Sequence, residues 1–118
     1  MHAKVNLDEM DVRELDDGVA DLKSVGMELR PQQMRPNVWV FETGERLNRH
    51  YQEKQEELYH VLSGEFELRY EDETDELVAG DIVVVSPEEI RQLVCVEPGE
   101  VFVVGAPAVK DDGVVVKE

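Results

Sequence analysis

The chain has 118 residues, 42% of them hydrophobic, which is enough for one domain with a packed core and excludes a disordered chain. Its 28 acidic and 12 basic residues give a net charge of -16, and the resulting repulsion excludes nucleic acid and anionic membranes as partners. The single cysteine excludes a disulfide framework, and without a signal peptide or ~20 consecutive apolar residues a cytoplasmic protein is expected.

The acidic residues are spread along the whole chain and are not gathered into a tail. Their mutual repulsion would weaken the compact state at low ionic strength. Molar salt, with a screening length of about 3 Å, would relieve most of that repulsion. The pattern therefore favours a protein from the high-salt cytoplasm of a halophile, and an ordinary acidic protein is the alternative.

Residues 1–36 predict an irregular N-terminal arm, because glycine and proline interrupt scattered apolar residues among many acids. Short edge strands are expected near residues 19–23 and 26–30. A helical turn is expected within residues 8–15, where the sequence Asp-Asp-Gly at 16–18 would end it.

From residue 37 onward, short apolar segments recur between turn signals, and this spacing predicts an all-β sandwich or barrel over residues 37–107. Residues 108–118 form a tail whose valines at 114–116 could add an edge strand, so the whole chain is a single domain. Trp39 shares a face with Phe41 and is expected in the core. No window of ten or more residues has helical periodicity. The expected strands cover residues 37–42, 46–51, 57–62, 65–71, 76–78, 82–85, 90–96 and 100–105.

One group of residues carries possible chemistry. His50 and Gln52 are two apart, so on one strand they share a face. Glu57 follows the polar turn 53–56, and a hairpin would return its carboxylate to the same face. An imidazole, an amide oxygen and a carboxylate together could hold a divalent cation.

The spacing of Gly44, His50, Glu57 and Gly64 resembles the first cupin motif, which is a glycine, five residues, His-x-His, three or four residues, a glutamate, six residues and a glycine. Gln52 stands at the position of the second histidine. The resemblance covers about residues 37–107. It implies a small single-domain cupin of the cupin 2, conserved-barrel type, which is a jelly-roll β-barrel with a side-chain-lined pocket.

Residues 80–87 resemble the second cupin motif, in which Gly-Asp opens a strand that ends in proline. The family has a histidine four residues after that proline, and Arg91 occupies the position here. The resemblance therefore implies that the family's mononuclear metal site, three histidines and one carboxylate, is incomplete. An arginine stays protonated and cannot ligate a cation. If Arg91 points inward, it opposes a metal and gives Glu57 a partner.

Three functions stay open on this basis. The first is a binding module for a small polar or anionic molecule, with no metal cofactor, in which Arg91 anchors the ligand beside His50, Gln52, Glu57 and Tyr59. The second is an isomerase or dioxygenase with one divalent transition metal on His50, Gln52 and Glu57. The third is a scaffold protein whose pocket is vestigial.

A homodimer is expected as well. The N-terminal arm and the tail contain more apolar residues than free termini need, and sheet edges require cover that a second copy can supply. The resemblance implies the same, since cupins are often dimeric.

Overall fold

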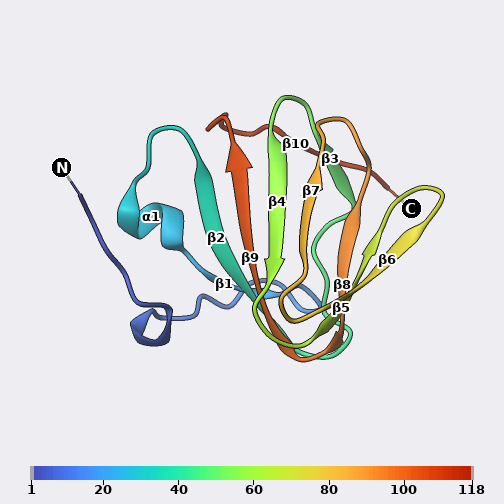
Figure 1. Cartoon of the computed structure of the whole chain (residues 1–118), viewed down its shortest axis with the longest axis horizontal. Helices are drawn as coiled ribbons and strands as arrows, with labels where there is room; N and C mark the ends of the chain where they lie inside the picture. The colour runs from blue at the N-terminus through green and yellow to red at the C-terminus, as the bar shows by residue number, and fades with distance from the viewer. Residues whose placement is uncertain (1, 118) are drawn as a thin grey trace.

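Two layers of antiparallel strands face each other and curve into a barrel (Figure 1). The computed structural model describes residues 2–117, and in this range the chain forms ten strands, the 3-10 turn η1 (Leu7–Glu9) and the helix α1 (Val25–Leu29). The strands are β1 (Asp21–Lys23), β2 (Arg35–Phe41), β3 (His50–Gln52), β4 (Glu56–Val61), β5 (Glu65–Arg69), β6 (Thr74–Val78), β7 (Ile82–Val85), β8 (Gln92–Glu97), β9 (Gly99–Ala106) and β10 (Gly113–Val115).

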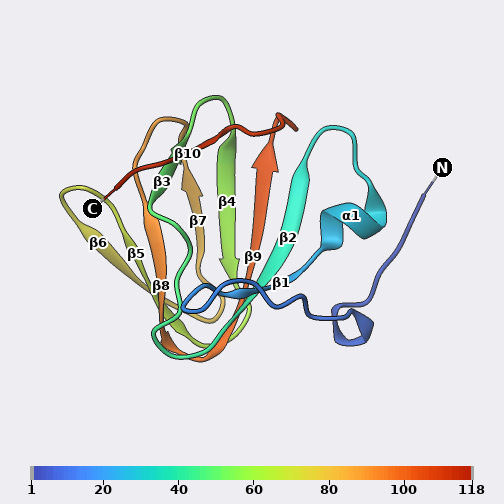
Figure 2. The same cartoon turned by 180° about the vertical axis from the view of Figure 1, so that it is seen from behind.

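The first sheet has the strand order β1-β2-β9-β4-β7, and the second layer contains the sheet β6-β5-β8 and the pair β10-β3. Isolated bridges from His50 to Arg91 and from Arg46 to Val94 connect the β3 segment to the β8 segment. Figures 1 and 2 show the two layers from opposite sides. This is a jelly-roll arrangement, and with five residues in α1 and three in η1 it confirms the all-β prediction.

The core fills the space between the layers. Phe66 and Leu68 on β5 are buried, whereas the alternate residues Glu65 and Arg69 are exposed. Phe41 on β2 meets Phe66 edge to face, with ring centroids 5.0 Å apart and an interplanar angle of 72°. Inward-facing side chains of the two layers thus join them, as the period-2 alternation predicted.

The N-terminal arm differs from the prediction in two places. The helical turn expected within residues 8–15 is only the 3-10 turn η1, which ends at Glu9, well before residues 16–18. The strand predicted over residues 26–30 is wrong, because residues 25–29 form α1, which ends where Arg30 adopts a left-handed conformation (φ 53°) before Pro31. Methionine, glutamate and leucine in this segment favour helix over strand. The strand predicted over 19–23 is present as β1. In residues 2–117 no helix has the length and apolar character to span a membrane.

The C-terminal tail forms the edge strand β10, which pairs antiparallel with β3. The buried Asp112 carboxylate accepts hydrogen bonds from the backbone N–H groups of Lys54 (2.9 Å) and Gln55 (2.8 Å). Burial alone would raise the pKa of Asp112, but these backbone donors hold it below its usual range. The Gln55 side chain also donates to the Val109 carbonyl at 2.9 Å. The tail is therefore fixed across the β3–β4 turn.

Gly64 shows why the first motif ends in glycine. It lies in the β4–β5 turn with φ at +85°, a conformation that strongly favours glycine. A Cβ atom at this position would also lie 2.6 Å from the Glu97 carbonyl oxygen. The turn that returns the chain from β4 to β5 thus requires glycine.

Candidate functional site

A cavity of 720 Å³ opens between the two layers of the barrel. Four of the five predicted site residues line it, namely His50 and Gln52 from β3 and Glu57 and Tyr59 from β4. The remaining lining residues come from the arm, β2, the β2–β3 segment, β9 and β10: Glu14, Leu15, Asp16, Val19, Trp39, Leu47, Asn48, Val103, Gly113 and Val115. The motif spacing therefore did bring these four polar side chains together.

The fifth predicted residue, Arg91, lies behind this wall. Its side chain is completely buried, at 0% exposure, and is not part of the cavity surface. Its Nη2 donates to Glu57 Oε1 at 2.7 Å, its Nη1 donates to the Glu89 carbonyl at 2.8 Å, and its Nε lies 3.4 Å from the Tyr59 hydroxyl. The structure thus shows the Arg91–Glu57 pair directly, but it gives Arg91 no surface for the predicted contact with a ligand.

Glu57 lies at the centre of a cluster that it forms with Arg91, Tyr59 and His50. Its Oε1 accepts hydrogen bonds from Arg91 and, at 2.9 Å, from the Tyr59 hydroxyl, and it lies 3.6 Å from His50 Nε2. Burial by itself would raise the pKa of Glu57, but the neighbouring His50 side chain and the Arg91 guanidinium outweigh burial and lower the pKa to about 2. Glu57 is therefore a carboxylate at any physiological pH. Burial and the adjacent carboxylate raise the pKa of Tyr59, so this hydroxyl stays protonated.

His50 has a defined tautomer. Its Nδ1 lies 2.8 Å from the Asn48 carbonyl oxygen, and because a carbonyl only accepts, the partner assigns the proton to Nδ1. In the neutral ring Nε2 then carries the lone pair, next to Glu57. The backbone holds this position, since His50 and Arg91 exchange N–H···O hydrogen bonds of 2.9 and 3.0 Å. The side chain can therefore accept a hydrogen bond, or a proton, from a molecule in the cavity.

The electrostatics of the cavity differ from the prediction. The carboxylates of Glu14, Asp16 and Glu57 line it, while no lysine or arginine does among the described lining residues. A smaller hollow of 310 Å³ also borders Gln52 and Glu57, and its lining includes Arg35 together with the acidic Asp111 and Asp112. The predicted anionic ligand therefore finds no excess of positive charge, and an uncharged polar ligand fits this lining better.

The donor set does not fit the metal centre that the second interpretation requires. Within residues 2–117 no three histidine, cysteine, aspartate or glutamate side chains are grouped to hold a metal ion. Of the predicted ligands, Glu57 offers an oxygen that already accepts from Arg91 and Tyr59. A divalent cation there would face a fixed guanidinium charge a few ångströms away, which costs several kcal/mol even at an effective dielectric of ~20.

Sequence reasoning missed part of the cavity wall. Trp39 packs against the core as expected, but it also lines the cavity. Its position on β2 opposite Val101 and near Val103 follows from strand pairing, which the sequence alone does not reveal. The arm and β10 contribute through long-range packing for the same reason. Figure 2 shows the arm crossing the barrel near one end of the strands.

The family model for the cupin domain matches residues 37–105, more than half of the chain. The chain is a cupin. The match agrees with the sequence resemblance and with the predicted barrel, and among curated proteins none matches the chain.

Several solved structures share the fold of this cupin. A double-stranded β-helix protein from Klebsiella pneumoniae is 21% identical, with a TM-score of 0.80 over 98% of this chain and 97% of that one. The Streptomyces nucleoside dehydratase Pac13, whose variants were solved with uridine, is 19% identical, with a TM-score of 0.79 over 99% and 92%. KdgF from Halomonas sp. is 22% identical, with a TM-score of 0.75 over 90% and 95%. At these identities the likeness shows the fold alone.

Proposed function

We propose that this cupin binds a small, uncharged, polar molecule, of the kind of a sugar or nucleoside, in the barrel cavity and that it does so without a metal. The observation that carries the proposal is the buried Arg91–Glu57–Tyr59 cluster, in which hydrogen bonds join protein groups at the position where the sequence resemblance implies the family's metal. A buried ion pair of this kind compensates its own charge and leaves the cavity without a strong anion anchor.

The cavity wall suits such a ligand chemically. His50 Nε2 can accept a hydrogen bond, and the Gln52 amide can both donate and accept one. These contacts match the hydroxyl groups of a sugar and the carbonyl and amide groups of a nucleobase. Trp39 and Val103 add apolar surface for the face of a ring. Convergent polar groups on an apolar wall are the usual design of a small-molecule site. Uridine in the Streptomyces structures supports the choice of ligand class.

One observation favours a second candidate, an acid–base enzyme acting on the bound molecule. The lone pair of His50 Nε2 is directed by the Nδ1–Asn48 hydrogen bond, and the Glu57 carboxylate 3.6 Å away would stabilise the imidazolium that forms when His50 takes a proton. This reaction needs no metal. It would be a proton abstraction, with His50 as base and Glu57 as the group that stabilises its charged form.

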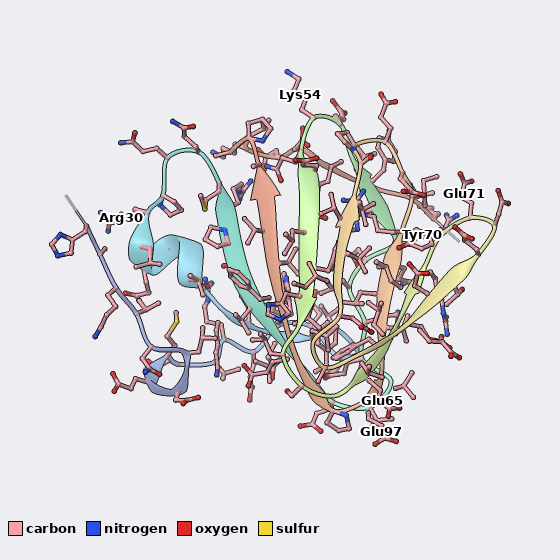
Figure 3. The ribbon with its side chains drawn as sticks, viewed as in Figure 1. Arg30, Lys54, Glu65, Tyr70, Glu71 and Glu97 are labelled. Carbon is pink, nitrogen blue, oxygen red and sulfur yellow. The ribbon has the colours of Figure 1, made fainter. Side chains whose placement is uncertain are left out.

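The test uses Trp39, the only tryptophan of the chain, as a reporter in the cavity wall. We expect uridine or a neutral hexose from a panel to change the Trp39 fluorescence saturably. His50→Ala and Gln52→Ala should each weaken that binding about five- to tenfold, because each removes a hydrogen bond worth about 1–1.5 kcal/mol. Lys54→Gln, at the outward-pointing tip of the β3–β4 turn (Figure 3), is the matched control. A saturable response to anions alone would refute the proposal.

We also propose the assembly and setting that the sequence indicated, a homodimer in a high-salt cytoplasm. The support for the dimer is the outer face of the first sheet, where Leu58, Phe102 and Val84 lie on adjacent strands. Ile82 and Val84 are 59% and 58% exposed there. Apolar side chains of this size on an open sheet face are typical of an interface.

A further inference from the structure

A second hollow, of 510 Å³, lies outside the barrel between α1, the start of β2 and the segment that follows β9. It shares no lining residue with the 720 Å³ cavity. Figures 1 and 2 both place α1 beside β2, on the side of the barrel away from β5 and β6. The two linings are therefore distinct, although Arg35 also borders the smaller hollow beside Gln52 and Glu57.

The hollow gathers positive charge on an acidic molecule. Arg13, Arg35 and Lys110 line it, three of only 12 basic residues in a chain with 28 acidic ones. No aspartate or glutamate is among its lining residues, and in residues 2–117 none of these three bases forms an ion pair. Acids lie beyond them. Arg13 also borders a hollow that is lined by Glu9, Asp11 and Glu28. Arg35 also borders one that is lined by Glu57, Asp111 and Asp112.

Neutral partners hold the two guanidinium groups at the hollow. Arg13 Nη1 lies 3.3 Å from Ser24 Oγ and 3.1 Å from Met27 Sδ. Arg35 Nη1 donates to the Val109 carbonyl at 3.0 Å. A guanidinium has five N–H donors, so both arginines keep donors for an anion. The two groups are oriented without having their charge cancelled.

The rest of the lining is apolar. Met27 and Met34 are 67% and 47% exposed and lie beside Pro31 and Pro36. Methionine is flexible and polarizable, and it adapts to ligands of irregular shape. The hollow therefore offers both parts of an amphipathic anion a contact. The basic side chains can bind the charged group, and the two exposed methionines can contact the apolar chain.

We propose that this hollow is a binding site for a small amphipathic organic anion, whose carboxylate contacts Arg35 and Lys110 and whose short apolar chain lies on Met27 and Met34. The volume is in the range of small-molecule sites. The basic residues of the hollow favour an anion there, whereas the acidic surface of the rest of the molecule repels anions. The site uses none of the side chains that line the 720 Å³ cavity.

Methionine-methyl NMR of the full chain tests the proposal, with octanoate as the probe and salt held constant. We expect saturable shifts of the Met27 and Met34 methyl signals, while the signal of Met10, which lines another hollow, stays unchanged. Octanol, the uncharged counterpart, should cause much smaller shifts at equal concentration. Equal shifts with octanol would refute an anion site, as would the absence of shifts at both methionines.

Charge variants complete the test. Arg35→Gln and Lys110→Gln should each weaken octanoate binding about two- to fivefold, which corresponds to the loss of one partly exposed charge contact. Arg30→Gln and Lys54→Gln remove bases outside the hollow (Figure 3) and serve as matched controls. If the controls weaken binding as much as the two site variants do, octanoate responds only to the net charge, and the proposed site is refuted.

Discussion

At the scale of single residues, Arg91 and Glu57 form a buried ion pair beside the barrel cavity. Removing one partner leaves a buried charge without compensation, so Glu57→Gln and Arg91→Met should each lower the free energy of unfolding by about 3–5 kcal/mol. The double variant should lose clearly less than the two single losses added together, because neither charge is then left alone. Denaturant unfolding of the four proteins measures this coupling. Additive losses would mean that the pair does not interact.

The lowered pKa of Glu57 predicts a dependence of stability on pH. Its folded-state pKa of about 2 lies below the ordinary value of 4.5, so ionised Glu57 stabilises the fold above pH 4.5, and this contribution is lost as the pH falls towards 2. The contribution is at most about 3 kcal/mol. Urea unfolding from pH 6 to pH 3 should therefore show a flatter acid limb for Glu57→Gln than for the wild type. Glu71→Gln, an exposed carboxylate at the tip of the β5–β6 turn (Figure 3), should leave the limb unchanged.

The sequence predicted that most of these cavity side chains would lie together, for a physical reason. His50, Gln52 and Glu57 are linked by one strand and one short turn, so their spacing alone brings them together. Arg91 comes from a distant part of the chain. The motif spacing predicted that Arg91 would meet Glu57. Whether its guanidinium group reaches the cavity depends on the packing around this side chain, and that packing buries Arg91 completely.

At the scale of elements, the alternation of apolar and polar residues predicted the strands, and it gave no guide where contacts between distant segments determine the structure. The exposed and buried residues of β5 alternate in the sequence as they do in the barrel. Residues 25–29 have no such pattern, and there the helix-forming side chains and Pro31 gave α1 where a strand was expected. The wall formed by β10 depends on Asp112 bonding to the β3–β4 turn, a contact between segments far apart in the chain.

Strand pairing also places like charges opposite each other. Glu65 on β5 pairs with Glu97 on β8, and both lie at the same end of the barrel (Figure 3). Like charges directly across strands destabilise a sheet by a few tenths of a kcal/mol up to about 1 kcal/mol. Glu97→Gln should therefore raise the melting temperature at low salt, and this gain should shrink in molar potassium chloride as screening removes the repulsion.

The wild-type melting temperature should itself rise with potassium chloride, since the charge of -16 repels itself throughout the fold. A melting temperature that falls with salt, or an advantage of Glu97→Gln that persists in molar salt, would show that charge repulsion is not the cause.

At the scale of the whole molecule, the apolar outer face of the first sheet predicts two chains per particle. Val84→Lys places a charge on the exposed apolar part of that face, on the edge strand β7, and should convert the dimer to a monomer. Val96→Lys, at an exposed valine on β8 in the other layer, should not. Light scattering at micromolar protein in molar salt measures both. A monomeric wild type under these conditions would contradict the dimer.

The central claim is that an arginine–glutamate pair has replaced the metal of the barrel. Elemental analysis of the purified wild type, after incubation with nickel, zinc or iron and removal of unbound ions, tests it most directly. We predict far less than one metal per chain for the wild type and a clear rise for Arg91→His, which adds a second imidazole beside His50, with Arg30→His as the control. One tightly held transition metal per wild-type chain would contradict the account.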